Sequence, residues 1–156
     1  GGVKKAIPRF EQDTILVING DSIIVNQKKS CPIENLYKNF SNNIDILLLL
    51  VPRKKSVGYI GKGDFVRCNK TILAKIRRKL PYEFSDLVFT GWQLLNKEIF
   101  KNIDEEFFSL NMLYNQAQKK NRLYAIIYNG TFLHVSDSKS LLLAENYLRS
   151  NNIKLL

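Results

Sequence analysis

The chain alternates between short apolar runs and amphipathic stretches. Two runs rich in β-branched residues or leucine cover Thr14 to Ile18 and Ile44 to Val51. Apolar runs of this length that end at turn residues or proline are typical of buried strands. The segment between them predicts a helix that is capped by Ser30 or Cys31 and has Pro32 in its first turn. This helix has one apolar face, which is made of Leu36, Tyr37 and Phe40.

The middle of the chain predicts shorter elements. Phe65 to Cys68 and Thr71 to Leu73 are expected to form two strands on either side of an Asn-Lys turn. Asp86 to Leu95 predicts another strand, in which Gly91 marks a point where a backbone or ligand approaches closely. Ser109 is a suitable cap for a helix, because the following apolar residues fall at helical spacing.

The end of the chain carries the clearest local signal. Two β-rich runs, Tyr124 to Tyr128 and Thr131 to Val135, are joined by Asn129-Gly130. This connection predicts an antiparallel hairpin with positive φ at both turn residues. Asp137 or Ser138 then caps a final helix with an apolar stripe made of Leu141, Leu142, Ala144, Tyr147 and Leu148. Together the signals predict one α/β domain with a mixed, mostly parallel sheet.

Composition limits the class of protein. The chain has 156 residues, is 45% hydrophobic and carries a formal charge of +10, which suits a single soluble domain with a real core. No apolar stretch approaches the roughly 18 to 20 residues of a membrane helix, so no membrane partner is expected. Two separated cysteines, Cys31 and Cys68, and a single histidine favour neither a disulfide framework nor a zinc site. A reduced, cytoplasmic compartment is therefore expected.

The basic residues raise the question of nucleic-acid binding. They lie in short, separate clusters at Lys28-Lys29, Arg53 to Lys55, Lys75 to Lys79 and Lys119-Lys120. A nucleic-acid-binding protein gathers such residues on one face or element to neutralise phosphates. A solvated surface is therefore the favoured interpretation, with Lys75 to Lys79 as the best candidate patch.

Two residues are candidates for chemistry. Asp21 follows a predicted strand through Asn19-Gly20, which places it in the crevice where open α/β sheets bind ligands. A carboxylate there suits Mg²⁺, although Asn-Gly-Asp is also common in plain turns. His134 is expected at the same rim, and a lone histidine is more often structural than a ligand. The glycines around Lys62 lack the spacing of a phosphate-binding loop and predict a connection between strands.

The order of several segments resembles the bacterial sugar-1-phosphate nucleotidyltransferases. The most similar subgroup comprises the N-acetylmuramate-1-phosphate uridylyltransferase-like and mannose-1-phosphate guanylyltransferase-like proteins. No single motif is decisive, but the segments occur in the family's order along the whole chain. They are Gly1 to Pro8, Ile15 to Asp21, Lys62 to Phe65, Phe89 to Leu95 with Ile99-Phe100, Phe108 to Asn111, Arg122 to Tyr124, and His134-Val135 before a Leu-Ala-Glu helix.

The resemblance implies a fold and a reaction. The expected fold is a Rossmann-like three-layer α/β/α sandwich, in which a sugar 1-phosphate attacks the α-phosphate of a nucleoside triphosphate. The products are a nucleotide sugar and pyrophosphate, and Mg²⁺ neutralises charge on the phosphates. By resemblance, Asp21 is the catalytic, metal-binding carboxylate. The remaining candidate substrate-binding residues are Gly1 and Gly2 at the nucleotide base, Gly63, Thr90 and Gly91 at the sugar, and Asn19 and His134.

Two departures from the family matter. Many members have a second metal-binding Asp at the position of His134. Imidazole is a poor Mg²⁺ ligand, so His134 is expected to contact a phosphate or orient a metal-bound water. The family also opens with a glycine-rich loop that holds the triphosphate, and nothing in this sequence matches it.

The departures lead to a hypothesis about residues 1–156. They are expected to form a single incomplete nucleotidyltransferase domain without the N-terminal part of the fold. The chain is then inactive alone and is completed by a separately encoded N-terminal half. A non-catalytic sugar-phosphate-binding or interaction module is the alternative, and a basic nucleic-acid-binding domain is the less favoured one.

Overall fold

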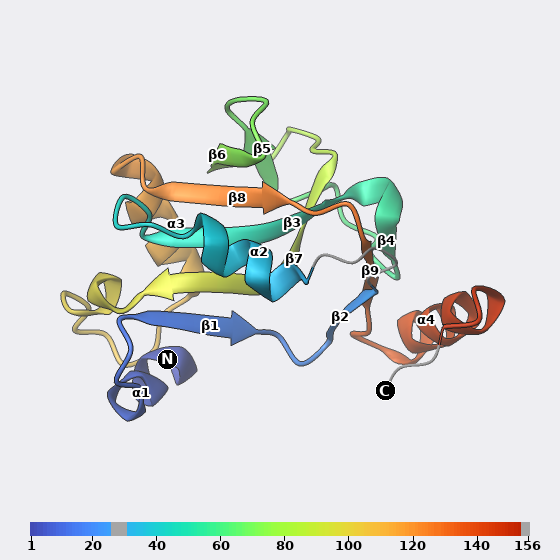
Figure 1. The fold of residues 1–156 in the computed structure, drawn as a ribbon, viewed down its shortest axis with the longest axis horizontal. Coiled ribbons are helices and arrows are strands. Elements are labelled where there is room, and N and C mark those ends of the chain that lie inside the picture. Colours follow the sequence, from blue (N-terminus) through green and yellow to red (C-terminus); the bar gives the residue numbers. More distant parts are fainter. Residues whose placement is uncertain (26–30, 154–156) are drawn as a thin grey trace.

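A computed structural model describes residues 1–25 and 31–153 of the chain. It contains α-helices, two β-sheets and three short 3₁₀ helices (Figure 1). The helices are α1 (Gly2–Ala6), α2 (Pro32–Asn39), α3 (Leu110–Lys119) and α4 (Ser138–Ser150), with 3₁₀ helices η1 (Ile7–Arg9), η2 (Arg53–Lys55) and η3 (Lys97–Phe100). The strands are β1 (Thr14–Ile18), β2 (Ser22–Val25), β3 (Ile46–Pro52), β4 (Ser56–Val57), β5 (Phe65–Arg67), β6 (Leu73–Arg78), β7 (Leu87–Asn96), β8 (Leu123–Ile127) and β9 (Thr131–His134).

The larger sheet has six strands in the order β1-β7-β3-β8-β6-β5. The α/β class and the mixed sheet are confirmed. The expectation of a mostly parallel sheet is wrong, because β3 and β8 form its one parallel pair among the described strands. The connection from β5 to β6 is short and gives an antiparallel pair. The other three antiparallel pairs of this sheet join strands that are far apart in the sequence, so local connections do not set their direction.

Helices cover both faces of this sheet and give the expected Rossmann-like layers (Figure 1). β3 lies in the interior of the sheet, and its residues alternate between the two faces. Leu48 belongs to the apolar cluster that contains Leu113 of α3, whereas Leu47 belongs to the cluster that contains Leu36 of α2. All of these side chains are almost completely buried. Burial on both faces explains why β3 has a continuous apolar sequence.

The predicted hairpin at Asn129-Gly130 is wrong. Both neighbouring positions of β8 are occupied by β3 and β6, so the chain leaves the large sheet after β8. β9 instead lies in a small sheet of order β2-β9-β4. Asn129 and Gly130 are absent from the positive-φ residues of the described chain. Glycine at position 130 is instead explained by lack of space, because a Cβ there would lie 2.9 Å from the carbonyl oxygen of Val25.

Two helix starts follow the sequence signals closely. Cys31 is the N-cap of α2, while Ser30, the other proposed cap, lies outside the described residues. Asp137 caps α4 and forms a capping box with Ser140. The apolar stripe of α4 is only partly buried, because Leu141 and Leu142 are 46% and 57% exposed. In the described part of the chain, no helix combines the length and hydrophobicity needed to cross a membrane.

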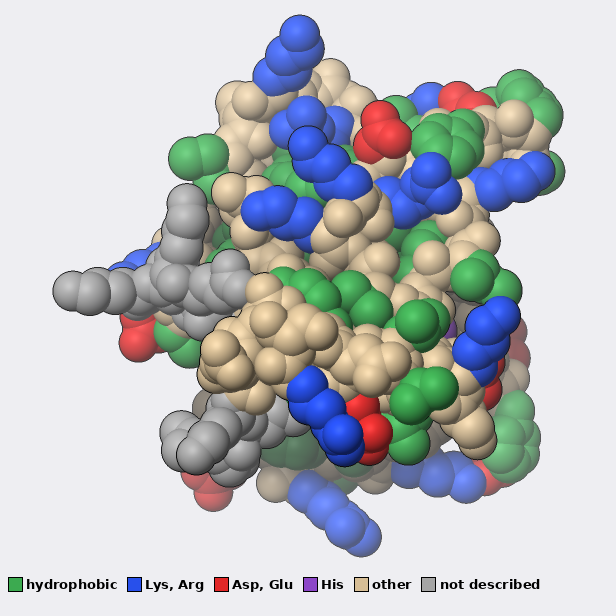
Figure 2. All heavy atoms as spheres, turned by 90° about the vertical axis from the view of Figure 1, so that its right-hand side faces the viewer, with side chains coloured by type: hydrophobic (Ala, Val, Ile, Leu, Met, Phe, Trp, Pro, Cys, Tyr) green, Lys and Arg blue, Asp and Glu red, His purple; other side chains and the backbone are tan. Residues whose placement is uncertain are grey.

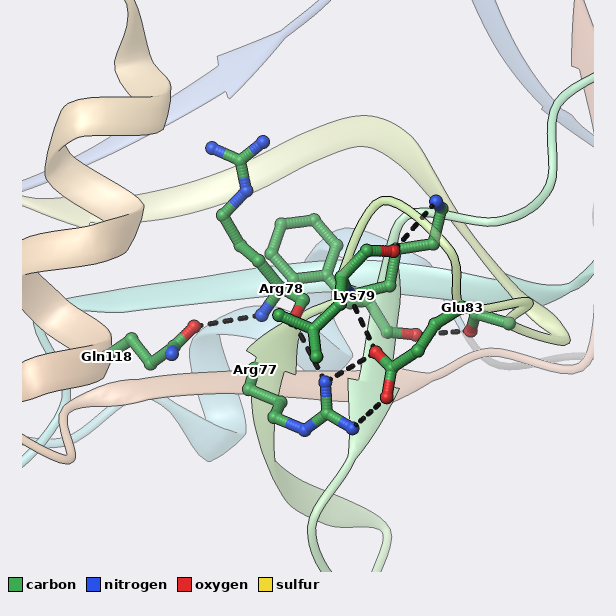
Figure 3. A network of polar contacts seen from close by, with 8 residues as sticks. Arg77, Arg78, Lys79, Glu83 and Gln118 are labelled. Carbon is green, nitrogen blue, oxygen red and sulfur yellow. Dashed lines mark hydrogen bonds and ion pairs between the residues drawn. The ribbon is translucent and has the colours of Figure 1, made fainter.

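Basic side chains of the described residues lie on several elements, among them η2, β6 and the end of α3. On the face shown in Figure 2, Lys and Arg side chains are spread among hydrophobic ones. The cluster at Lys75 to Lys79 lies along β6 and its end, where a strand directs successive side chains to opposite faces. Arg77 donates two hydrogen bonds of 2.7 Å to the carboxylate of Glu83 (Figure 3). This pairing neutralises one cation of the candidate patch and fastens β6 to the following turn.

Candidate active site

Asp21 lies in the turn that follows β1, where β1 faces β7. The amide of Asn19 donates to the carbonyl of Gly91 across this pair at 3.2 Å. Gly91 has φ +80°, and a Cβ there would lie 2.7 Å from Cγ of Asn19. Glycine is therefore required at this position for both its conformation and its lack of a side chain. The close approach holds the Asn19–Asp21 turn against β7.

Asp21 and His134 are neighbours through the pairing of β2 with β9. Ser22 lies opposite His134 in this pairing, and the amide of Val135 donates to the carbonyl of Asp21 at 2.9 Å. Nε2 of His134 lies 3.6 Å from Oδ2 of Asp21. The Asp21 side chain is 43% exposed and that of His134 is 30% exposed. Both residues therefore share one rim, as expected, although β2 rather than the predicted hairpin brings them together.

The segment between β4 and β5 brings two further polar side chains to the same place. Oδ2 of Asp64 accepts from the amide of Phe89 at 2.9 Å, and Oδ1 of Asp64 accepts from the hydroxyl of Tyr59 at 3.3 Å. The Tyr59 hydroxyl in turn accepts from the amide of Gly63 at 3.1 Å. Burial and the Asp64 carboxylate raise the pKa of Tyr59 to about 12, so this phenol keeps its proton. Burial raises the pKa of Asp64 as well.

The loop that carries Asp64 has a defined shape. Gly63 has φ +79°, and the backbone of Ser85 occupies the space that a side chain would need. The amide of Ser85 donates to the carbonyl of Lys62 at 2.9 Å. Ser85 follows the turn that is held by Arg77 and Glu83 (Figure 3). The ion pair therefore supports the loop behind Asp64 although it lies outside the site.

The hydroxyl of Thr90 is already used in hydrogen bonds within the fold. Its Oγ1 donates to the carbonyl of Leu49 at 2.9 Å and accepts from the amide of Trp92 at 3.3 Å. The pairing of β3 with β7 shifts register between Leu48 and Leu50, beside this contact. Ser22 also donates its hydroxyl to the carbonyl of Thr90. These bonds use the one proton of the Thr90 hydroxyl within the fold.

These elements line a small cavity of about 140 Å³ that is open to solvent on one side. It brings together five of the candidate residues, which are Asn19, Asp21, Thr90, Gly91 and His134. Its other lining residues are Tyr59, Asp64, Phe89 and Phe132, which the sequence analysis did not select. Gly63 is not among the lining residues, but its amide donates to the hydroxyl of Tyr59, which is. Gly1 and Gly2, at the start of α1, are not among the lining residues, and their role at a nucleotide base stays a prediction.

The missed residues carried a weak sequence signal. Tyr59 and Asp64 belong to the glycine-containing stretch that predicted only a connection between strands. The alternation of glycine with polar residues and an aromatic marked a shaped loop. The partner that makes Asp64 part of the site is the backbone amide of Phe89, which is 25 positions away. That contact depends on the packing of β7 and is not visible in the local sequence.

The donor set suits Mg²⁺ that is held mainly by substrate. Among the described residues, no group of three His, Cys, Asp or Glu side chains could form a metal site by itself. Mg²⁺ commonly takes one or two carboxylates and completes its shell with waters and substrate phosphates. Asp21 offers a half-exposed carboxylate at the cavity, without a Lys or Arg partner among the ion pairs of the described chain. The residues present therefore fit such an ion.

Solved structures identify the class of fold. The UDP-glucose pyrophosphorylase from Acinetobacter baumannii superposes with a TM-score of 0.74 at 14% identity, covering 98% of this chain and 56% of its own. The inositol-1-phosphate CTP transferase from T. maritima gives 0.60 at 14% identity, covering 98% and 62%. The chain therefore has the fold of nucleotidyltransferases that act on sugar phosphates or related phosphates.

A sequence relative points within that class. The N-acetylmuramate alpha-1-phosphate uridylyltransferase of Caulobacter vibrioides is 25% identical over 145 residues, which are 93% of this chain and 59% of the relative. No protein-family model matches the chain. The expected resemblance to sugar-1-phosphate nucleotidyltransferases is thus confirmed. The chain spans about six tenths of the length of the proteins that it matches.

Proposed function

We propose that this chain is the sugar-phosphate and metal-binding part of a nucleotidyltransferase that joins a sugar 1-phosphate to a nucleoside triphosphate. The observation that best supports this proposal is the small cavity at the end of β1, where Oδ2 of Asp21 lies 3.6 Å from Nε2 of His134. It occurs in the fold of enzymes that handle such phosphates, and one solved relative of this fold is a UTP-bound enzyme. A cytoplasmic location, where nucleoside triphosphates are available, is part of this proposal.

The chemistry assigned to the site is positioning and charge stabilisation. Asp21 would hold Mg²⁺, which would supply positive charge to the phosphates when bound. His134, beside Asp21, contacts a phosphate oxygen or orients a water of the metal shell. The close contact between Asn19 and Gly91 fixes the turn that presents Asp21. An in-line phosphoryl displacement needs this kind of fixed geometry more than it needs a protein nucleophile.

The proposal includes a second polypeptide. β1 is the end strand of the six-stranded sheet, and within the described chain it pairs only with β7. An edge strand of this kind has free N–H and C=O groups that can pair with another strand. A separately encoded N-terminal half would add its strands here and bring the glycine-rich triphosphate loop. Without it the triphosphate is not held in line, so the chain alone is expected to release no pyrophosphate.

A non-catalytic sugar-phosphate-binding module is the alternative. It is favoured by one observation, which is that Asp21, Asp64 and His134 already lie around one cavity in these residues. A module of this kind would bind sugar phosphates without any need for the other half. The two functions share the ligand and differ in the requirement for a triphosphate.

Pyrophosphate release distinguishes the two. The purified chain is incubated with Mg²⁺ and a panel of nucleoside triphosphates and sugar 1-phosphates, first alone and then with the separately expressed N-terminal part of the Caulobacter relative. A fusion of that part to Gly1 is the second format, because it removes the need for association. Release only in the presence of the added part supports the proposal. Release by the chain alone contradicts the two-part proposal, and sugar-phosphate binding with no release in either format favours the module.

A further inference from the structure

The carboxylate of Asp64 is the one acidic group of the cavity besides Asp21. It comes from the loop before β5, on a different element from Asp21. No ion pair of the described chain includes Asp64. A partly buried carboxylate without a cation is costly unless hydrogen-bond donors surround it. The protein supplies two such donors.

The two donors leave part of the carboxylate unused. The amide of Phe89 and the hydroxyl of Tyr59 each donate to a different oxygen of Asp64. An ionised carboxylate has about four acceptor sites, so about two are left for a ligand. The Phe89 bond fixes the orientation of the group, and the amide of Gly63 fixes the phenol that meets its other oxygen. Burial raises the pKa of Asp64 and outweighs the two hydrogen bonds and the charges of Lys79 and Arg78, which lower it.

The cavity is small and open on one side. Its volume of about 140 Å³ lies well below the roughly 300 Å³ of the smallest drug-sized pockets. Only part of a sugar phosphate would therefore lie inside it, with the rest of the ligand extending toward solvent. A sugar 1-phosphate whose phosphate lies at Asp21 and His134 would direct its ring toward the other wall, which contains Asp64.

We infer that Asp64 determines specificity for the sugar by accepting a hydrogen bond from one ring hydroxyl. This inference rests on the proposed function and adds to it the residue that recognises the acceptor. A fixed carboxylate discriminates strongly, because a sugar that lacks the matching hydroxyl leaves a buried acceptor unpaired. Tyr59 is a positioning residue, which acts by holding Asp64 in place.

Binding of sugar phosphates tests this inference without any need for turnover. Calorimetry with Mg²⁺ compares glucose, mannose, N-acetylglucosamine and N-acetylmuramate 1-phosphates, and then the monodeoxy analogues of the sugar that binds best. Wild type is expected to lose about tenfold or more in affinity for one deoxy analogue and little for the others. The same series is measured for Asp64→Asn, with inorganic phosphate as the ligand that lacks a ring.

The variant should change recognition of the ring only. Asp64→Asn is expected to bind the preferred sugar phosphate about tenfold more weakly and to lose the discrimination against the deoxy analogue, because one charged acceptor is gone. Affinity for inorganic phosphate should stay within about twofold, because this ligand has no ring hydroxyl to meet Asp64. Asp104→Asn, an exposed aspartate that does not line the cavity, is the matched control and should behave as wild type.

The outcomes separate the inference from the proposed function. If Asp64→Asn folds and keeps both its affinity and its discrimination, the inference is overturned and the proposed function stands. If Asp64→Asn fails to fold, the wild-type deoxy series decides, and equal affinity for all analogues overturns the inference. Tyr59→Phe is then the second variant, with a several-fold loss of sugar-phosphate affinity expected. If wild type binds none of the sugar phosphates, either alone or with the added N-terminal part, the proposed function itself fails.

Discussion

Gly91→Ala tests how closely the turn that presents Asp21 depends on β7. The new residue would have to adopt φ +80°, which costs an ordinary residue roughly 1 to 2 kcal/mol. Its Cβ would lie 2.7 Å from Cγ and Nδ2 of Asn19 and 2.8 Å from its Cβ, so the Asn19 side chain must also move. We expect the free energy of unfolding to fall by about 2 to 3 kcal/mol. For a chain of this size, that corresponds to a loss of about 4 to 12 °C in Tm.

Urea unfolding followed by circular dichroism measures this change. Gly20→Ala is the matched control in the same turn, because no atom lies within 4 Å of its added Cβ. It should stay within about 0.5 kcal/mol of wild type. The double variant Asn19→Gly with Gly91→Ala lacks the clash, because residue 19 then has no side chain. Gly91→Ala should therefore cost about 1 kcal/mol less in the Asn19→Gly background than in wild type, and this difference is the coupling energy between the two positions. A Gly91→Ala protein as stable as the Gly20→Ala protein would refute the assigned contact.

Three further variants test other parts of the structure. Asp21→Asn should keep the fold and lower pyrophosphate release by the completed enzyme by about two orders of magnitude or more, because a bound metal would supply several kcal/mol of transition-state stabilisation. Unchanged turnover would remove Asp21 from the site. The hydrogen bonds from Arg77 lower the pKa of Glu83 to about 2 from 4.5, so the ion pair stabilises the fold fully above pH 4.5 and is lost as the pH falls toward 2. The Tm difference between wild type and Glu83→Gln should therefore narrow over that range, whereas a pH-independent difference would argue against the pair. Tyr114→Phe removes the 2.9 Å bond to buried Gln93 and should lower the free energy of unfolding by about 1 to 3 kcal/mol in urea, with no change expected only if Gln93 finds another donor.

Local signals predicted several elements well, but β2 was not predicted, and the strand expected at Thr71 to Leu73 is β6 at Leu73–Arg78. The apolar run at β3, the cap at Ser109 and the cap at Asp137 all appear in the structure as expected. Each depends on neighbours within a few residues, through side-chain burial or a bond to a nearby amide. Such features can be predicted from sequence because the interacting groups are close together in the chain.

Strand pairing could not be predicted in the same way. Asn129-Gly130 carries a strong local hairpin signal, but β8 already has β3 and β6 as partners. Competition between distant strands therefore decided the path of the chain, and the turn adopted another conformation. The antiparallel direction of β7 relative to both β1 and β3 likewise depends on pairing between strands that are distant in the sequence. A pattern of apolar residues indicates that a segment is a strand without indicating its partner.

In the candidate site, too, a residue placed by the local sequence was predicted, and one placed by distant contacts was not. Asp21 was found because a strand followed by a turn places its residues at the rim of a sheet. Asp64 was missed because its part in the cavity depends on the amide of Phe89 and the hydroxyl of Tyr59. The rim position of His134 was predicted for a reason that the structure corrects, since β2 holds it there.

Binding of a sugar 1-phosphate at the end of β1 is the central claim, and an NMR titration tests it most directly. The 18.0 kDa chain is labelled with ¹⁵N and titrated with the sugar 1-phosphate panel and Mg²⁺. We predict saturable shifts at the amides of Asn19, Asp21 and Gly91, which weaken strongly in Asp21→Asn. The claim would be contradicted by the absence of shifts at these amides up to about 10 mM ligand, or by shifts confined to the scattered basic clusters.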